Sequence, residues 1–479
     1  MKADSVANPF LEESVGKLYA KFLPSAIIAL LISTVASLID TVVVSHFMGP
    51  AALSAVNICM PIYSILTAIA MLIVGGASTM YSKYLGQGDK DKAHKIFTLS
   101  GVVLLVIGIL YMIAGVLFTN PIVHFLGATD NAVMVDILKK EVTIADMATD
   151  YARILFLFVL FNIMFPFLQT FLRIDMNPGL TVVAIVACAA VNLVLDILFI
   201  GPFLCETGFG TTGAAFATCL AYVVATIIMC THFFRKKNTL RFVKGFFHWG
   251  ELKTAIATGF PASVTLFGTA ITTTVFNNFI ITSCEELTRY GITGVGELYV
   301  SVFSVIVQVM TIAMAVYVGI PNCAQPMIAA NFAAGKKDRV KQIFETGMKM
   351  EIIANIVLTA LLCLLAGWIA NAFSMSKGAV DMTEVCVFAI RIFSISLVFT
   401  GINQMVLYLL QTCNFVKEST IISALSGTVL LIAGLYLLAG VVFPYHVMGL
   451  GIWLSYTFAQ ALTMVYSLLV FKKHKNAIF

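Results

Sequence analysis

Long apolar runs fill most of this 479-residue sequence and constrain its fold more than any other feature. A helix that crosses a bilayer needs about 20 consecutive, mostly apolar residues, since lipid offers its backbone no hydrogen bonds. Twelve runs meet this length. They span residues 18–46, 52–82, 94–118, 147–172, 178–201, 211–234, 258–283, 298–331, 341–370, 384–413, 419–442 and 447–471. We therefore expect an all-α, polytopic protein with twelve transmembrane helices in a lipid bilayer.

The composition excludes an ordinary soluble domain. Hydrophobic residues make up 60% of the chain and charged residues only 11%, and the mean hydropathy is +0.98. Soluble domains carry about 25% charged residues. The net charge of +5 does not require a nucleic-acid partner, because membrane proteins concentrate Lys and Arg on their cytoplasmic side.

The distribution of basic residues predicts the orientation. If both termini lie on one side, all but a few of the 29 Lys and Arg residues fall on that side. The exceptions are Lys139, Lys140, Arg153, Arg289, Lys377 and Arg391. The positive-inside rule therefore places both termini in the cytoplasm, as an even number of helices requires.

The chain also repeats itself. "LGQGDKDKAHKIF", which ends at Phe97, matches "FAAGKKDRVKQIF", which ends at Phe344. Pro24 matches Pro261 in the same order, and "FLQTFLRIDMNPGL" from Phe167 matches "LLQTCNFVKESTII" from Leu409. We expect two parallel six-helix repeats, an N-lobe of residues 1–234 and a C-lobe of 258–479, joined by a cytoplasmic linker, 235–257.

Two acids are expected to lie well inside the spans, Asp40 and Asp196, and none inside the spans of the second half. An Asp at the centre of a membrane helix costs about 2.5–3.5 kcal/mol on insertion scales, so it usually faces protein or water on an ion or substrate path. The alternative is a hydrogen bond between helices. The repeat places Asn277 opposite Asp40 and Leu438 opposite Asp196, so the fold itself does not require the two acids.

The surroundings of the acids are polar. Ser33, Ser37, Asp40, Thr41 and Ser45 recur at three- and four-residue steps and share one helix face, and Asn192 precedes Asp196 by four residues. Such oxygen-rich groups suit a hard cation such as Na⁺, and two close carboxylates can also share a proton. The sequence leaves Na⁺ and H⁺ open.

Further candidates are weaker. Most of the 21 Met residues are expected to face lipid or pack against other helices, although methionine also suits promiscuous apolar surfaces. The candidates for a substrate cavity are Met60, Met71, Met310, Met314 and Asn277. Pro24 is a candidate hinge in the first span, because proline disrupts the helical hydrogen-bond ladder.

Five segments carry a resemblance that covers both halves of the chain. They are "DTVVVSHFMGPAALSAVN" (40–57), "YSKYLGQGDKDKA" (81–93), "NLVLDILFI" (192–200), "GAAFATCLA" (213–221) and "AQPMIAANFAAGKKDRV" (324–340). Together and in order they resemble the multidrug and toxic compound extrusion (MATE) family, on the side of its MepA- and DinF-like bacterial branch.

The resemblance implies an exporter in the bacterial cytoplasmic membrane, with two lobes around a central cavity. Members exchange organic, often cationic compounds against Na⁺ or H⁺ and need no other cofactor. Carried over by position, the cation site comprises Asp40, Asn192, Asp196 and Thr218, with Tyr151 nearby; these oxygens would also hold Na⁺. The loop from Asn120 to Asp150 is unusually long for the family.

We therefore expect a cation-coupled antiporter for small organic molecules, and a monomer. A flippase of lipids or lipid-linked oligosaccharides in the same superfamily is the alternative, although it favours a strongly cationic cavity that these spans lack. An intramembrane enzyme would need a nucleophile–base pair or a metal set at membrane depth, which the sequence does not show. A receptor or scaffold does not explain paired buried acids.

Overall fold

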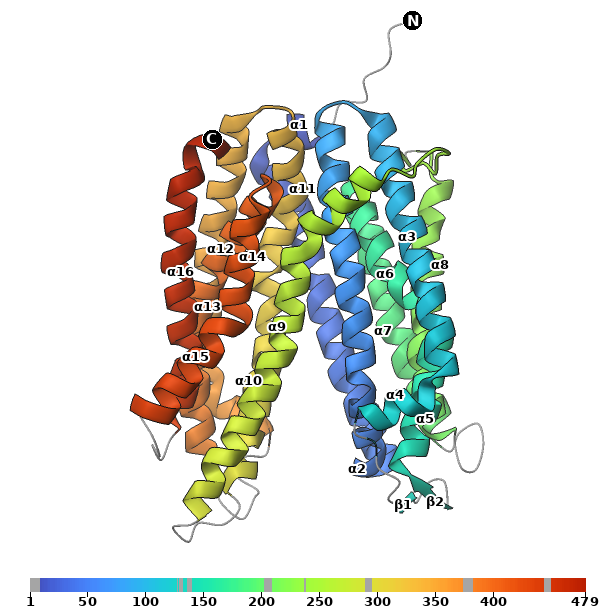
Figure 1. Cartoon of the computed structure of the whole chain (residues 1–479), viewed down its shortest axis with the longest axis vertical. Helices are drawn as coiled ribbons and strands as arrows, with labels where there is room; N and C mark the ends of the chain where they lie inside the picture. Colours follow the sequence, from blue (N-terminus) through green and yellow to red (C-terminus); the bar gives the residue numbers. More distant parts are fainter. Residues whose placement is uncertain are drawn as a thin grey trace, which may run out of the picture. The chain divides into compact units, whose positions relative to one another are not determined.

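The computed structural model describes residues 9–126, 128, 132–135, 140–201, 209–236, 238–288, 295–373, 382–442 and 449–479. Long helices dominate these residues (Figure 1). Eleven helices are long and apolar enough to cross a membrane, or twelve if one bent pair counts as a single span. The expected all-α membrane fold is therefore confirmed, and each of the twelve apolar runs corresponds to a helix or a group of helices.

The first six runs form the helices of the N-terminal half. The first two lie in one long element whose spans are Val15–Ser37 and Ile58–Gly86. The fourth run is broken, with a bend of 53° between α5 and α6. The elements are α1 (Pro9–Glu12), α2 (Val15–Gly86), α3 (Lys90–Leu117), α5 (Ile144–Leu157), α6 (Val159–Ile174), α7 (Pro178–Ile200), α8 (Gly210–Cys230) and a short 3₁₀ helix, η2 (Thr231–Phe234).

The other six runs form the helices of the C-terminal half. Two spans are segmented: α10 and α11 share the span Val302–Ala333, and π-helical turns interrupt the span Val416–Val442. The elements are α9 (Trp249–Thr288), α10 (Val295–Tyr317), α11 (Gly319–Ala333), α12 (Lys337–Ala372), α13 (Thr383–Thr412), α14 (Val416–Ala424), η3 (Leu425–Val429), α15 (Leu430–Leu437), η4 (Leu438–Val442) and α16 (Leu450–Ile478).

The long segment after α3 is more ordered than a loop. It contains a short helix, α4 (Thr119–Phe125), and an antiparallel pair of strands, β1 (Ala132–Val135) and β2 (Lys140–Thr143), in which Ala132 lies opposite Thr143. Helix α5 begins directly after β2, where the Thr143 hydroxyl accepts a hydrogen bond from the Asp146 amide at 2.9 Å. The long segment noted between Asn120 and Asp150 therefore contains regular secondary structure in its described residues.

The chain divides into two compact units. The first unit comprises Ile28–Tyr81 and Asp89–Gly259; the second comprises the chain up to Ile27, Ser82–Gly88 and Phe260–Phe479. Helices α2 and α9 thus pass from one unit to the other after Ile27 and Gly259, and α2 passes back after Tyr81. The crossings at Ile27 and Gly259 lie within three residues of a repeat-related proline, Pro24 or Pro261. The lobe boundaries at 234 and 258 remain a prediction.

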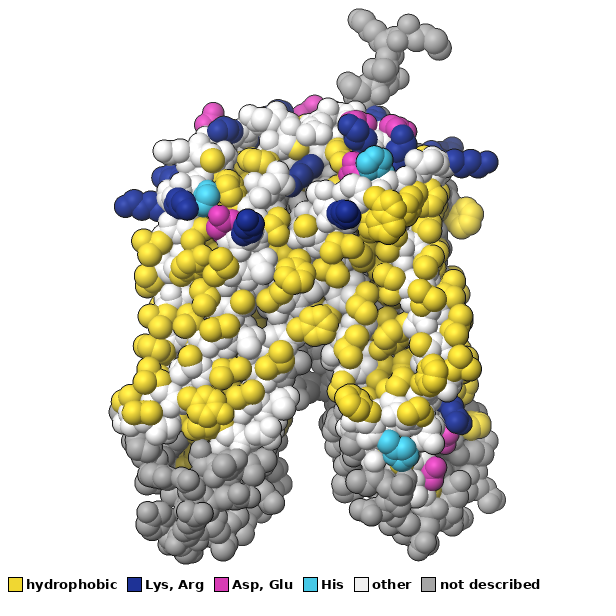
Figure 2. Space-filling view, viewed as in Figure 1, with side chains coloured by type: hydrophobic (Ala, Val, Ile, Leu, Met, Phe, Trp, Pro, Cys, Tyr) yellow, Lys and Arg dark blue, Asp and Glu magenta, His cyan; other side chains and the backbone are white. Residues whose placement is uncertain are grey.

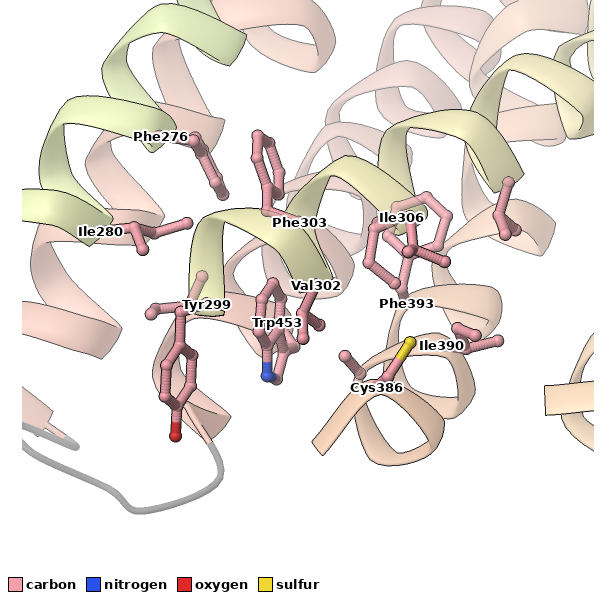
Figure 3. Packing of buried hydrophobic residues seen from close by; sticks show 14 of the residues in the cluster. Phe276, Ile280, Tyr299, Val302, Phe303, Ile306, Cys386, Ile390, Phe393 and Trp453 are labelled. Atoms are coloured by element: carbon pink, nitrogen blue, oxygen red, sulfur yellow. The ribbon is translucent and has the colours of Figure 1, made fainter. Parts of the chain in front are cut away.

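Each unit has its own apolar core. In the second unit Phe276 stacks on Phe303, with ring centroids 5.3 Å apart, and Trp453 lies parallel to Tyr299 (Figure 3). In the first unit Phe97 packs between Phe167 and Phe171 at 5.3 and 5.0 Å. These contacts join α9, α10 and α16 in the second unit, and α3 and α6 in the first.

The surface fits a lipid environment. On the face in Figure 2, hydrophobic side chains cover the middle of the helices, and Lys and Arg side chains gather mainly towards one end. Large apolar side chains on the spans are strongly exposed, with Leu364 at 80% and Leu110 at 61%. A soluble monomer rarely exposes so much contiguous apolar surface, whereas a transmembrane protein must.

Candidate functional site

The carboxyl groups of Asp40 on α2 and Asp196 on α7 are direct neighbours and interact electrostatically. Asp196 is fully buried, and neither of its carboxylate oxygens has a hydrogen-bond partner of good geometry among the described residues. Asp40 is half-buried. Neither acid forms an ion pair with a basic side chain in the described parts of the chain.

Asn192 and Thr218 border this acidic pair. The Asn192 amide donates a hydrogen bond to the Thr218 hydroxyl at 3.3 Å and so links α7 to α8. Asn192 lies one helical turn before Asp196, which places both on one side of α7. Asn192 therefore lies on the same side of α7 as the Asp196 carboxyl group.

Tyr151 completes the group of residues expected from the sequence. It is buried in α5 and lies within electrostatic range of both Asp40 and Asp196. Side chains from two other helices donate hydrogen bonds to backbone carbonyls of α5. Cys59 of α2 binds the Ala148 carbonyl at 3.4 Å, and Thr211 of α8 binds the Met147 carbonyl at 3.0 Å. These contacts join α5, which carries Tyr151, to α2 and α8.

A cavity of about 310 Å³ lies beside the pair, between α2 and α7, and Asp40 and Asn192 are the two polar residues in its lining. The remaining lining is aliphatic: Leu31, Ile32, Val35, Ala36, Ile39, Ala189, Ala190 and Leu193. Its volume is at the lower end of the range for small-molecule pockets, about 300–1,000 Å³. One acid thus faces an apolar cavity, whereas its partner is buried behind it.

The remaining predicted residues have different outcomes. Met60 and Met71 belong to the first unit, whereas Asn277, Met310 and Met314 belong to the second. Met310 packs against the apolar core of its unit, as an ordinary core residue does. The Ser33 hydroxyl donates to the Ala29 carbonyl of its own helix at 2.9 Å. The side chains of Thr41 and Ser45 lie outside the described residues.

Sequence reasoning missed a second polar group in the first unit. The hydroxyls of Tyr63 on α2 and Tyr222 on α8 lie 2.7 Å apart. Asn162 of α6 is buried near Cys219, and its carbonyl oxygen has no hydrogen-bond partner among the described residues. In an apolar run a tyrosine is expected to be a packing residue, so the sequence did not indicate that Tyr63 and Tyr222 form a polar pair.

The expectation that the second half holds no acid well inside its spans was wrong. Glu351 is the fifteenth residue of α12 and is fully buried. The signal was present in the sequence, because Glu351 lies within the apolar run 341–370. Charged residues near the start of that run make Glu351 look like part of a helix end, although it is the eleventh residue of the run.

Comparison with known proteins agrees with this architecture. A solved structure described as MATE in complex with MaL6 superposes with a TM-score of 0.87 at 21% identity, over 99% of both chains. The chain is also similar to the "Multidrug export protein MepA" of two staphylococci. Identity is 22% with the Staphylococcus saprophyticus protein, over 90% of both chains. It is 24% with the Staphylococcus haemolyticus protein, over 88% of this chain and 87% of the relative.

The family model MatE matches residues 25–198 and 274–437, which together make up more than half of the chain. The two matched segments lie in the two halves of the sequence, in agreement with the internal repeat. The resemblance noted from the sequence motifs is thereby confirmed, and the chain is a member of the MatE family of membrane transporters.

Proposed function

We propose that this protein is a cation-coupled secondary antiporter that exports organic, cationic or amphipathic compounds. The printed name of its staphylococcal relatives, "Multidrug export protein MepA", supports the export of such compounds. An inward gradient of Na⁺ or H⁺ would provide the driving force. The protein would work as a monomer in the bacterial cytoplasmic membrane, with both termini in the cytoplasm.

The observation that carries the proposal is the Asp40–Asp196 pair. Two adjacent carboxyl groups in an apolar span cannot both stay ionised without a counter-charge, because the low dielectric strengthens their repulsion and removes their hydration. Since no basic side chain among the described residues pairs with them, a mobile cation must neutralise the site. A proton shared between the two carboxyl groups reduces their repulsion. Na⁺ would bind the carboxylate oxygens and, in addition, the oxygens of Asn192 and Thr218.

The cavity beside Asp40 supports an organic substrate. Its aliphatic wall can hold an apolar body without specific hydrogen bonds, and the Asp40 carboxylate can attract a positive charge. Substrate and coupling ion would then compete for the same carboxylate. Such competition would couple the two ligands, because the site releases one ligand when it binds the other.

A hinge at Pro24 would convert this competition into transport. Helix α2 passes from the second unit to the first only three residues after Pro24, and Asp40 lies further along the same helix. A change of charge at Asp40 would therefore favour a different position of the α2 segment that belongs to the first unit. Proline removes a helical hydrogen bond, so α2 can bend at Pro24 to reach that position.

The test is transport in proteoliposomes with one imposed gradient at a time. A fluorescent organic cation serves as substrate, and its movement is measured under a Na⁺ gradient, a H⁺ gradient and no gradient. The proposal expects uphill movement of the cation under one gradient and only equilibration without it. Equal movement under all three conditions would contradict antiport, and movement of a labelled lipid instead would favour the flippase alternative.

A further inference from the structure

A second buried acid lies in the other unit, on one face of α12. Ile343, Gly347, Glu351 and Asn355 follow one another at four-residue steps, so they share this face. All four are buried. Tyr19 of α2 covers the beginning of the face, where its hydroxyl donates a hydrogen bond to the Ile343 carbonyl at 3.0 Å.

The Glu351 carboxyl is only half satisfied. Its Oε1 accepts a hydrogen bond from the Asn355 amide at 2.8 Å, whereas Oε2 has no partner among the described residues. The amide oxygen of Asn355 also lacks a partner there. Glu351 forms no ion pair with any described Lys, Arg or His.

Two glycines make room for this group. A Cβ atom on Gly401 of α13 would lie 2.5 Å from the Asn355 amide nitrogen and 2.6 Å from Oε1 of Glu351. A Cβ atom on Gly347 would overlap the Tyr19 hydroxyl. Real Cβ atoms do not approach polar atoms so closely, so α13 and α2 pack tightly against the carboxyl and its tyrosine neighbour.

Among the described residues, the groups that face Glu351 carry no positive charge. The Tyr19 hydroxyl comes from α2, and the Cys323 thiol of α11 lies close to that tyrosine. The neighbours from α12 and α13 are Asn355 and Gly401, which do not titrate. Two other charged residues lie near Glu351 on α12, Glu345 and Lys349. Their side chains are exposed, so they lie on the opposite side of α12 from the buried face.

The internal repeat shows that the fold does not need this carboxyl. Aligning Phe97 with Phe344 places Leu104 of α3 opposite Glu351 and Gly108 opposite Asn355. Leu104 is also fully buried. The same position in the repeat is therefore filled by an aliphatic side chain in the first half and by an acid in the second.

We propose that Glu351 is a second proton-binding site of this protein, in the second unit and separate from the Asp40–Asp196 pair. An ionised carboxylate without a cation is strongly disfavoured at this depth, so Glu351 takes up H⁺ at Oε2 and is neutral in this packed arrangement. A metal cation fits less well, because hard cations take about six oxygen ligands, and the described residues offer only two unpartnered oxygens here, Oε2 of Glu351 and the amide oxygen of Asn355. Tyr19 is a positioning residue: its hydroxyl binds the Ile343 carbonyl and packs against Gly347, one helical turn before Glu351.

The inference does not depend on antiport, because it concerns proton binding alone. Its test is pH-difference infrared spectroscopy of the reconstituted full-length protein, in the region where protonated carboxylic acids absorb. The pH steps lie between about 6 and 9, above the range in which exposed Asp and Glu side chains take up protons. The background is the double variant Asp40→Asn/Asp196→Asn, which removes the signal of the other pair. The variants to compare are Glu351→Gln, Glu351→Asp and, as a matched control on the exposed side of α12, Glu345→Gln.

The expected result is a titrating carboxylic-acid band in the background protein that disappears completely in Glu351→Gln and persists in Glu345→Gln. In Glu351→Asp the band persists at a shifted frequency, which shows that the carboxyl is the absorbing group even if the Gln variant folds poorly. The inference is overturned if the band survives Glu351→Gln, or if the background protein shows no titrating band. Failure of the transport assay with an intact band would instead argue against the proposed antiport alone.

Discussion

The Nε2 atom of His232 lies 2.6 Å from Oδ2 of Asp175, and both side chains are buried in the first unit. Asn177 contacts the other ring nitrogen of His232 at 2.9 Å. The backbone amide and the hydroxyl of Thr239 both donate to Asp175, and the Thr239 carbonyl contacts His94 at 3.0 Å. Asp175 thus fastens the basic segment after η2 to the loop between α6 and α7.

Asp175→Ala should release this segment, because Thr239 would lose both of its hydrogen bonds to the carboxylate and His232 would lose its partner. The segment carries trypsin sites at Arg235, Lys236, Arg241 and Lys244. We expect cleavage there by limited trypsin digestion to become at least several-fold faster. Asp146→Ala, at an exposed position of α5, is the control and should leave the rate unchanged; equal rates for both variants would refute the role of Asp175.

Backbone contact between α2 and α9 should make two glycines irreplaceable. A Cβ on Gly76 would overlap the Ala255 carbonyl, and a Cβ on Gly259 would overlap the Leu72 carbonyl. Gly76→Ala and Gly259→Ala should each lower the free energy of unfolding by about 1–3 kcal/mol, because overpacking displaces whole helices. Thermal unfolding in detergent measures this. Gly179→Ala on α7 meets open space and should be at least as stable as the wild type, so equal losses at all three glycines would contradict the packing argument.

The acidic pair should be essential for coupling but not for folding. Asp40→Asn and Asp196→Asn should each reduce cation-driven export at least about tenfold, equivalent to about 1.4 kcal/mol. Thermal stability should stay the same or rise, because an amide avoids the cost of an unpaired buried charge. Export is measured in proteoliposomes with Asp146→Asn as the exposed control. Wild-type export by both variants would rule out the proposed coupling site.

The stabilisation that the N-cap residue Asp89 gives to the beginning of α3 should depend on pH. The Asp89 carboxylate accepts a hydrogen bond from the Lys92 amide at 3.1 Å, and this bond lowers the pKa of the Asp89 carboxyl. Since the folded pKa lies below the unfolded value, the stabilisation is present at neutral pH and is lost as the pH falls through the folded pKa.

Asp89→Ala should therefore lower the stability at pH 7 by about 1 kcal/mol, the usual cost of losing a helix N-cap, and the difference from wild type should shrink below about pH 4. Thermal unfolding at a series of pH values measures it. Asp91→Ala, which removes only the exposed ion pair with Lys95, should have a smaller effect. A pH-independent difference for Asp89→Ala would show that the cap is not the cause.

Replacing Pro24 or Pro261 should change the rate of export more than the affinity for the substrate. Pro24→Ala and Pro261→Ala restore a backbone donor where α2 and α9 leave one unit for the other, and so stiffen both helices. We expect slower export with nearly unchanged binding of a fluorescent substrate. Pro166→Ala, within α6 and inside one unit, is the matched control. An equal effect at all three prolines would argue against hinges at the crossings.

Several features of the protein could be read from the sequence because they are local. A run of about 20 apolar residues buries its backbone in lipid as a helix whatever its neighbours are, so the twelve runs predicted the spans correctly. The same reasoning drew attention to Asp40 and Asp196, since a charge inside such a run is costly wherever the helix packs. It failed at Glu351 only because nearby charges made an interior position resemble a helix end.

Other features depend on which helices touch, and the tertiary structure alone decided them. Tyr63 pairs with Tyr222, Gly76 packs against Ala255, and Gly401 packs against Glu351, so each of these contacts joins segments that are far apart in the sequence. A period of four residues shows which side chains share a face of one helix but not which helix covers that face. Hydropathy therefore determined what enters the membrane, and close packing between helices determined which buried polar groups meet there and which lack a partner.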